Sequence, residues 1–255
     1  MSYFIDVQGT LIDDEKKQPI EGSIAFIDKL NAQKIPYVVV TNNTKFQSEA
    51  FHRFLCDLGF AIPKTHYLDP FMTLEFALQT KNVKSFGAQE FLDTMHEMGY
   101  AQTQEAPEAI VIASKKDFDA NEYADMIELA LQGAKIIGMH ATSIYAKDKR
   151  RYPGVGAILE MLRYATAKDY AVVGKPSTLF YQAGLNLLRA QGVPADFCDV
   201  TMISDDAIGD LLGAKALGMK SILVLSGKCQ SEHEVAHIRG SLDRIAENIG
   251  KIEDN

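Results

Sequence analysis

The sequence predicts an α/β fold in which a doubly wound parallel sheet is covered by helices on both faces. Short runs rich in β-branched residues alternate with amphipathic helical segments along most of the 255 residues, and this alternation is typical of βαβ units. The strand-like runs are almost wholly apolar, as expected for strands that are buried on both faces. In open sheets of this kind, ligands bind beyond the carboxyl ends of the strands.

The individual elements follow from these two patterns. Strands are predicted at YFIDV (3–7), PYVVVTN (36–42), AIVIAS (109–114), AKIIGM (134–139), YAVVG (170–174), VTMIS (200–204) and SILVLS (221–226). Apolar residues spaced three and four apart predict helices at 20–33, 48–60, 121–133, 156–166, 178–192 and 210–218. Helix ends are expected at four glycines, namely Gly59, Gly133, Gly192 and Gly218.

The composition excludes several classes of protein. The chain is 47% hydrophobic and 24% charged, which is ordinary for a soluble domain. Its net charge of −8 argues against general binding to nucleic acid or to a membrane surface. The 3 cysteines form neither a disulfide pattern nor a zinc pattern. A strand begins at residue 3, so no signal peptide is expected, and no apolar run would span a membrane. The expected location is cytoplasmic.

The first predicted strand ends on Asp6, and Gly9-Thr10-Leu11 follow it. A strand that stops on Asp before Gly-Thr is compatible with a simple Asx-type turn. The chemical alternative is a carboxylate nucleophile that forms an acyl-phosphate. Gln8 stands two residues after Asp6, where a second carboxylate would complete an acid/base pair.

Polar residues also follow two later strands. Thr41-Asn42-Asn43-Thr44 precede a helix, so that their hydroxyl, amide and N–H groups form either an anion cradle or an ordinary helix cap. In YAVVGKPS, Lys175 directly follows a buried strand, where lysine is rarely placed for packing. An ammonium beside a carboxylate nucleophile would keep that carboxylate ionised and neutralise phosphate charge.

The segment VTMISDDAIGD ends another strand with Asp205, Asp206 and Asp210. Crowded carboxylates are unfavourable unless a cation or solvent relieves them. Oxygen ligands without His or Cys suit Mg²⁺ rather than zinc. The alternative is acidic charge at a helix N-terminus, which the helix dipole favours.

The order of these motifs resembles the haloacid dehalogenase-like superfamily of aspartate-nucleophile phosphohydrolases, across nearly the whole chain. The motifs are Asp-x-x-Gly-Thr-Leu, strand-Thr-Asn, Gly-Lys-Pro and strand-Asp-Asp-x-x-x-Asp. FMTLEFAL, VKSFGAQEF, RYPGVGAILEML and GDLLGAKALGMKSILVLSGK are similar to its NagD-like branch. The resemblance implies a Rossmann-like catalytic core, residues 1–71 and 173–255, and an inserted α/β cap domain of the C2 type, residues 72–172.

The resemblance also implies a role for each motif residue. Asp6 would be the nucleophile, with Gln8 and Lys175 beside it in the catalytic site. Phosphate-binding groups would come from Thr41, Asn42, Asn43 and Lys175. Mg²⁺ ligands would come from Asp6, the main-chain carbonyl of Gln8, Asp205 and Asp210, and Asp206 would support them. Ser204 replaces the Gly that usually precedes the metal-binding Asp.

Gln8 is the main departure from the family, which usually has a second Asp here as general acid and base. The Gln8 amide can orient a water or a leaving group, but it cannot exchange a proton at neutral pH. General acid–base catalysis is worth about 10²–10⁴-fold, so turnover is expected to survive but to favour good leaving groups. Relatives that resemble phospholysine, phosphohistidine and pyrophosphate phosphatases also lack this Asp, which makes P–N bonds and pyrophosphate candidate targets.

Three functional classes are compatible with a carboxylate at the end of the first strand. The favoured one is a Mg²⁺-dependent phosphohydrolase that acts on small phosphorylated molecules. The second is a phospho-ligand-binding pseudoenzyme in which Gln8 is the disabling change. The third is a dehalogenase, which the acidic residues at 205–210 disfavour because such relatives need no metal.

Three further features carry weaker signals. HEVAH (233–237) matches a zinc-protease string, but no third ligand is evident, and Ser231-x-x-Glu234 instead predicts a capping box that opens a helix. The basic stretch KDKRRYPG (147–154) is predicted to be a solvated loop, with contact to a substrate anion as the alternative. The resemblance implies that the cap is a candidate homodimer interface, and the sequence leaves the oligomeric state open.

Overall fold

The computed structural model describes residues 2–102, 106–147 and 150–252. The chain forms two compact units. The first contains the chain up to Thr41, Glu49–Leu68 and the chain from Tyr181 onward, and the second contains Asn42–Ser48 and Asp69–Phe180. Contacts therefore group 42–48, 69–71 and 173–180 with the second unit, whereas the boundaries predicted from the sequence assign them to the core. Those domain boundaries stay a prediction.

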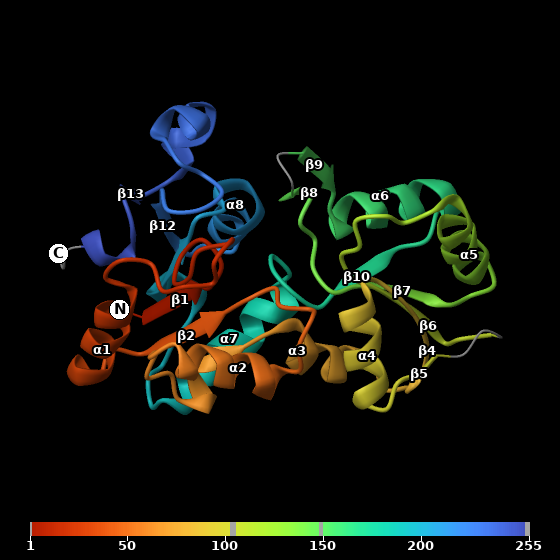
Figure 1. Ribbon diagram of the computed structural model, residues 1–255, viewed down its shortest axis with the longest axis horizontal. Coiled ribbons are helices and arrows are strands. Elements are labelled where there is room, and N and C mark those ends of the chain that lie inside the picture. Colours follow the sequence, from red (N-terminus) through yellow and green to blue (C-terminus); the bar gives the residue numbers. More distant parts are fainter. Residues whose placement is uncertain (1, 103–105, 148–149, 253–255) are drawn as a thin grey trace. The chain divides into compact units, whose positions relative to one another are not determined.

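The first unit is built on a six-stranded sheet in the order β13-β12-β11-β1-β2-β3, and every pair of neighbours in it is parallel. Its strands are β1 (Ser2–Asp6), β2 (Tyr37–Val40), β3 (Tyr67–Leu68), β11 (Val200–Ser204), β12 (Lys220–Val224) and β13 (Arg244–Ala246). The first strand in the chain lies inside the sheet (Figure 1). The chain therefore winds to both sides of β1, and the carboxyl ends of β1, β2 and β11 lie side by side.

Helices cover both faces of this sheet. Tyr3 of β1 packs edge-on against Phe26 of α1 (Ser23–Gln33), and its neighbour Phe4 stacks on Tyr181 of α7 (Thr178–Ala190). Successive side chains of a strand point to opposite faces, so α1 and α7 lie on opposite sides of β1. The first unit also contains α8 (Leu212–Ala216) and nearly all of α2 (Ser48–Asp57).

The second unit is built on a five-stranded parallel sheet in the order β10-β7-β6-β4-β5. The strands are β4 (Asn82–Phe86), β5 (Ala101–Gln102), β6 (Ala109–Ile112), β7 (Lys135–Gly138) and β10 (Tyr170–Val172). The helices are α3 (Pro70–Ala77), α4 (Gln89–Glu97), α5 (Ala120–Leu131) and α6 (Val155–Thr166).

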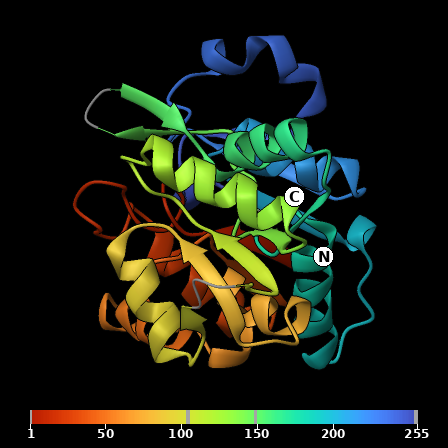
Figure 2. The same cartoon turned by 90° about the vertical axis from the view of Figure 1, so that its right-hand side faces the viewer.

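Alternation along β6 divides the core of the second unit in two. Val111 packs with residues of α3 and α4, whereas Ile110 and Ile112 pack with residues of α5 and α6. Figure 2 shows α5 and α6 side by side. The sheet is thus covered on both faces, as its continuous apolar strands predict.

An antiparallel hairpin of β8 (Ile144–Lys147) and β9 (Arg150–Pro153) also belongs to the second unit. The basic stretch 147–154 falls partly outside the described residues, because 148–149 are not among them. Within the described part, Arg150 and Arg151 are exposed. The rest of the prediction for this stretch stays open.

The structure confirms the predicted α/β class with parallel sheets, and each predicted strand is present. Each of the four glycines predicted to end helices has a positive φ. The sequence missed α3, α4, the hairpin and the strands β3, β4, β5 and β13. Within the described residues, no helix has the length and apolarity needed to cross a membrane.

Two predicted helices differ from expectation. The segment predicted as one helix at 210–218 is a π-helical turn, Ala207–Leu211, followed by the short α8. The C-terminal segment Glu232–Ser241 is a 3₁₀ helix. Its predicted capping box is wrong, because the Ser231 hydroxyl bonds to the Glu234 carboxylate at 3.0 Å and makes no cap bond to the main chain.

Candidate active site

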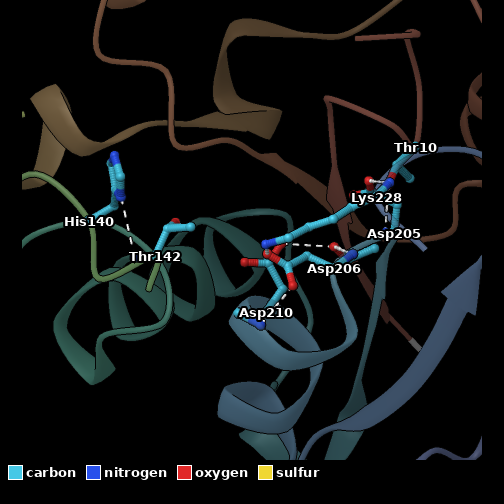
Figure 3. A network of polar contacts seen from close by, with 9 residues as sticks. Thr10, His140, Thr142, Asp205, Asp206, Asp210 and Lys228 are labelled. Atoms are coloured by element: carbon cyan, nitrogen blue, oxygen red, sulfur yellow. Dashed lines mark hydrogen bonds and ion pairs between the residues drawn. The ribbon is translucent and has the colours of Figure 1, made fainter. Parts of the chain in front are cut away.

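Two buried aspartates meet at the carboxyl edge of the first sheet. Asp6 is the last residue of β1, and Asp205 directly follows β11, which pairs with β1. Their side chains are 5% and 4% exposed, respectively. Thr10 links them, because its Oγ1 lies 3.4 Å from Asp6 Oδ2 as a donor and accepts from the Asp205 N–H at 3.2 Å (Figure 3). The arrangement brings a candidate nucleophile beside a second carboxylate.

The main chain fixes the position of one Asp205 oxygen. Oδ2 accepts from the main-chain N–H of Lys228 at 2.5 Å. Gly9 and Gly227 approach the same oxygen so closely that a Cβ at either position would overlap it. Gly9 also has a φ of +72°, a conformation that glycine adopts at little cost. The loops after β1 and β12 therefore hold the carboxylate through main-chain groups.

Neighbouring negative charge makes Asp205 costly to ionise. Burial, and then the negative charge of Asp6, raise the pKa of Asp205 well above its ordinary value, even though the Lys228 N–H acts to lower it. Asp210 contributes further negative charge, and it is itself only 5% exposed. A bound cation would relieve this repulsion.

The π-helical turn places the last of the acidic residues. Ser204 donates from its hydroxyl to Asp210 Oδ2 at 2.8 Å, and it accepts from the Asp206 N–H at 3.1 Å. Asp206 Oδ1 in turn accepts from the Gly209 N–H at 2.8 Å. Ser204, which departs from the family's usual Gly, is therefore used to orient Asp210. Single π turns of this kind occur frequently at functional sites.

Gln8 is held by a hydrogen bond from the neighbouring strand end. Thr41 Oγ1, fully buried, donates to Gln8 Oε1 at 3.0 Å. The amide oxygen is thereby occupied. Within the described part of the chain, the amide nitrogen of Gln8, which can only donate, has no hydrogen bond.

The remaining predicted site residues belong to the second unit. Asn42 Oδ1 accepts from the Lys175 N–H at 2.9 Å, and the Lys175 side chain is 2% exposed. Asn43 closes a turn, because its Nδ2 donates to the Phe46 carbonyl at 2.7 Å and its Oδ1 accepts from the Lys45 N–H at 3.2 Å. The structure thus brings Asp6, Gln8, Thr41, Asp205 and Asp210 together in the first unit, and Asn42 and Lys175 together in the second.

The donor set of the first unit fits Mg²⁺. Across the described ranges, no group of three or more His, Cys, Asp or Glu side chains is arranged as a metal cage. A site of fewer carboxylates, a main-chain carbonyl and waters matches the habits of Mg²⁺, which usually keeps several waters. Asp6 and Asp205 offer oxygen ligands only, and the negative charge of Asp6, which raises the pKa of Asp205, would be relieved by a cation held between them.

Two histidine arrangements lack the geometry for catalysis. His233 and His237 lie in the 3₁₀ helix, where residues four apart point in different directions. In the second unit, His140 Nδ1 accepts from the Thr142 N–H at 3.3 Å (Figure 3). The proton of a neutral His140 ring therefore sits on Nε2, which lies 3.1 Å from Ser114 Oγ. In that tautomer His140 donates to Ser114 and cannot act as its base.

Sequence reasoning missed three contributors to the site. Thr10 lies inside the quoted Gly-Thr-Leu motif, and Ser204 was noted only as a substitution. Lys228 lies in the quoted segment LVLSGK, and its ammonium bonds to Asp206 Oδ2 at 2.6 Å. Motif spacing identified the carboxylates, but the fold was needed to show which hydroxyls and which lysine contact them.

Comparisons with known proteins relate the chain to one family of hydrolases. Residues 3–101 match a family model described as haloacid dehalogenase-like hydrolase, and residues 172–252 match a second one described as HAD-hydrolase-like. The chain is 28% identical over 231 residues to haloacid dehalogenase-like hydrolase domain-containing protein 2 of Bos taurus, covering 90% of this chain and 86% of that protein.

Two further similarities concern proteins named for phosphatase activity or for the NagD branch. The chain is 27% identical over 240 residues to the phospholysine phosphohistidine inorganic pyrophosphate phosphatase of Danio rerio, covering 90% of this chain and 84% of that protein. NagD from E. coli K-12 superimposes with a TM-score of 0.77 at 18% identity, covering 99% of this chain and 98% of that one. The last similarity concerns the fold alone.

Proposed function

Because the chain is a phosphatase of the haloacid dehalogenase-like superfamily, in its NagD-like branch, we propose that it hydrolyses small phosphorylated molecules with Mg²⁺ and Asp6 as covalent nucleophile. One observation carries the proposal: Asp6 is buried at the carboxyl end of an inner strand, beside the buried carboxylate of Asp205. A buried pair of this kind is expensive unless it binds a cation.

The reaction proceeds in two displacements. A carboxylate oxygen of Asp6 attacks phosphorus, a new O–P bond forms, and the bond to the leaving group breaks with its electron pair. Water then attacks the aspartyl-phosphate, which releases inorganic phosphate and restores Asp6. Mg²⁺ held by Asp6, Asp205 and the Gln8 carbonyl would supply positive charge to the phosphoryl oxygens. Thr10 orients Asp6 through its hydroxyl.

Gln8 determines which leaving groups depart readily. Its amide oxygen is engaged by Thr41, so the group offers N–H donors that stabilise negative charge but transfer no proton. Substrates whose leaving groups need no protonation by the enzyme are favoured. One relative is named a phospholysine, phosphohistidine and pyrophosphate phosphatase, and its substrate classes, P–N bonds and phosphoanhydrides, meet this requirement.

Asn42, Asn43 and Lys175 are proposed to bind phosphate on the strength of the family resemblance. Within the second unit, the Asn42 side chain accepts from the Lys175 main chain, which supports a joint role. The alternative function, a phospho-ligand-binding pseudoenzyme, is supported by one feature only, the absence of an acid/base carboxylate at Gln8. A pure binder has no need of a buried nucleophile, so the enzyme is preferred.

The deciding experiment is phosphate release by the purified protein with Mg²⁺. The substrates are pyrophosphate, phosphoramidate, nitrophenyl phosphate and several alkyl phosphates. We expect pyrophosphate and phosphoramidate to be hydrolysed faster than the alkyl phosphates. Turnover is expected to disappear in Asp6→Asn, which keeps the shape of the side chain but removes the nucleophile.

Gln8→Asp separates the two functions. If the protein is an enzyme, this change should raise the turnover of alkyl phosphates by about 10²-fold, more than that of the other substrates, because it restores a general acid. If the wild type releases no phosphate from any substrate and Gln8→Asp does, the pseudoenzyme would be favoured. Equal rates of the wild type on alkyl phosphates and phosphoramidate would refute the leaving-group argument.

A further inference from the structure

Lys228 joins two of the acidic residues in the first unit. Its main-chain N–H donates to Asp205 Oδ2 at 2.5 Å, and its ammonium donates to Asp206 Oδ2 at 2.6 Å. The Lys228 side chain is 35% exposed and that of Asp206 is 16% exposed, so the pair is only partly screened by water. Figure 3 shows the lysine reaching toward the aspartates that follow β11.

The second oxygen of Asp206 is also engaged. Oδ1 accepts from the Gly209 N–H at 2.8 Å at the start of the π turn. Both oxygens of Asp206 are therefore hydrogen-bonded to protein donors. Asp206 is thus held by Lys228 and the π turn, although it directly follows Asp205 in the chain.

We propose that Lys228 is an internal counter-ion for the acidic group, defined as Asp6, Asp205, Asp206 and Asp210. Its ammonium stabilises the crowded carboxylates when no metal is bound, and it weakens Mg²⁺ binding by competing for the same negative charge. The proposal rests on the proposed function in one respect, since it takes Mg²⁺ to be the metal of this site.

The charge argument fixes the sign of each effect. Without metal, the acidic group contains four carboxylates, and removing the Lys228 ammonium, which bonds to Asp206, leaves their repulsion less compensated. With Mg²⁺ bound, the same ammonium repels the metal, so its removal favours binding. Loss of Lys228 also frees Asp206 Oδ2. A residue that merely orients the ligands would have the opposite effect on Mg²⁺ affinity.

Lys228→Met tests the ammonium alone. Methionine keeps an unbranched side chain, and the main-chain N–H to Asp205 is retained. We expect the melting temperature of the metal-free protein in EDTA to fall. In calorimetric titration, the Kd for Mg²⁺ should become about threefold to tenfold tighter at low salt. The rise in melting temperature on saturation with Mg²⁺ should be larger than in the wild type.

Lys215→Met is the matched control. Lys215 bonds to Asp243 at 2.9 Å with 33% and 44% of the two side chains exposed, and Asp243 contacts Ser221 at the amino end of β12, away from the site. This variant also loses one lysine and one ion pair. Its Kd for Mg²⁺ should match that of the wild type.

A double-mutant cycle with Asp206→Asn completes the test. The single variant Asp206→Asn removes one negative charge and should weaken Mg²⁺ binding, whereas the double variant with Lys228→Met should return toward the wild-type Kd.

An unchanged or higher Kd for Mg²⁺ in Lys228→Met would overturn the proposal. If the wild type binds no Mg²⁺, the metal assignment of the proposed function fails. The melting temperatures in EDTA then still decide whether Lys228 stabilises the acidic group, and equal losses in Lys228→Met and Lys215→Met would refute that.

Discussion

Gly9 occupies a position where a side chain would disturb both the backbone and the carboxylate beside it. Its φ is +72°, and a Cβ would overlap Asp205 Oδ2. Gly9 lies in the turn after β1. Its N–H donates to the Ile12 carbonyl at 2.8 Å, and its carbonyl accepts from the Ser226 hydroxyl at 2.8 Å. The turn is therefore tied at both ends and cannot easily move away from Asp205.

Gly9→Ala should therefore cost more than backbone strain alone. We expect a positive φ to cost about 1 kcal/mol in free energy of unfolding for alanine, with a further loss from the displaced carboxylate. Gly218→Ala is the control, because Gly218 has a φ of +94° and open space around its Cβ position. Urea denaturation should show a larger loss for Gly9→Ala, and only this variant should lose phosphatase activity. Equal losses and intact activity would contradict the close approach to Asp205.

Residue type at strand ends predicted the carboxylates but not their partners. Asp6 and Asp205 stand out in sequence because a charged residue at the end of an apolar strand needs a reason. In sequence, Thr10 and Lys228 are ordinary loop residues and Ser204 is an ordinary strand residue. Thr10 and Lys228 contact Asp205 only because the turn after β1 and the loop after β12 both reach the end of β11, a long-range event that local patterns do not contain. The Ser204 contact to Asp210 spans six residues and arises because Asp210 lies in the π turn.

At the scale of elements, strand prediction succeeded where strands were long and buried. The strands β3 and β5 contain only two residues each, Tyr67–Leu68 and Ala101–Gln102, which is too short for any periodic signal. The helix α3 carries apolar side chains on its exposed side as well as on its buried one, since Phe76 is 77% exposed while Phe71 and Leu74 are buried, so it lacks the pattern of an amphipathic helix. The π turn at 207–211 depends on the bond from Gly209 to Asp206, which a period of 3.6 does not anticipate.

Helix starts in the second unit offer a direct comparison of capping. Asp119 begins α5 with a complete capping box, in which its Oδ1 accepts from the Asn121 and Glu122 N–H groups at 2.7 and 2.9 Å. Ala88 begins α4 with no side-chain cap. The two helices lie on opposite faces of the same sheet.

Substitutions at these two positions should act in opposite directions. Asp119→Ala is expected to lower the free energy of unfolding by about 1 kcal/mol, and Ala88→Asp to raise it by up to about 1 kcal/mol, because each changes one cap. Urea titration followed by circular dichroism measures both, with the slope of the transition as a check on two-state unfolding. A gain in stability for Asp119→Ala, or a loss for Ala88→Asp, would show that packing rather than capping sets these helix ends.

At the scale of the whole molecule, the acidic group is a stability cost that the proposed function explains. The chain has a net charge of −8, and it nevertheless buries Asp6, Asp205 and Asp210 in one unit. Apolar residues of similar size would pack there at lower cost. A site that binds Mg²⁺ and phosphate requires these charges. The metal-free protein is therefore less stable, and the affinity of the site for Mg²⁺ is higher, than with apolar residues at these positions.

Asp205→Asn should make this cost measurable. Burial and the charge of Asp6 raise the pKa of Asp205 above its unfolded value of 3.8. An ionised Asp205 therefore lowers the free energy of unfolding at neutral pH, and this destabilisation is lost as the pH falls through the raised pKa. The metal-free variant is expected to melt above the wild type at pH 7, by about 2–4 °C for each 1 kcal/mol relieved.

Two comparisons test the origin of that difference. The gap in melting temperature between Asp205→Asn and the wild type should narrow as the pH is lowered, since the wild-type carboxyl becomes neutral as well. Saturating Mg²⁺ should reverse the order, because a ligand at about 100 times its Kd stabilises the wild type by about 2.7 kcal/mol and the variant has lost a ligand. The variant could instead melt below the wild type in EDTA at pH 7. That result would mean that the main-chain N–H and the ammonium of Lys228 stabilise ionised Asp205 more than burial destabilises it. In that case the pKa of Asp205 would lie below its ordinary value, and the repulsion that argues for a cation at this edge of the sheet would be absent.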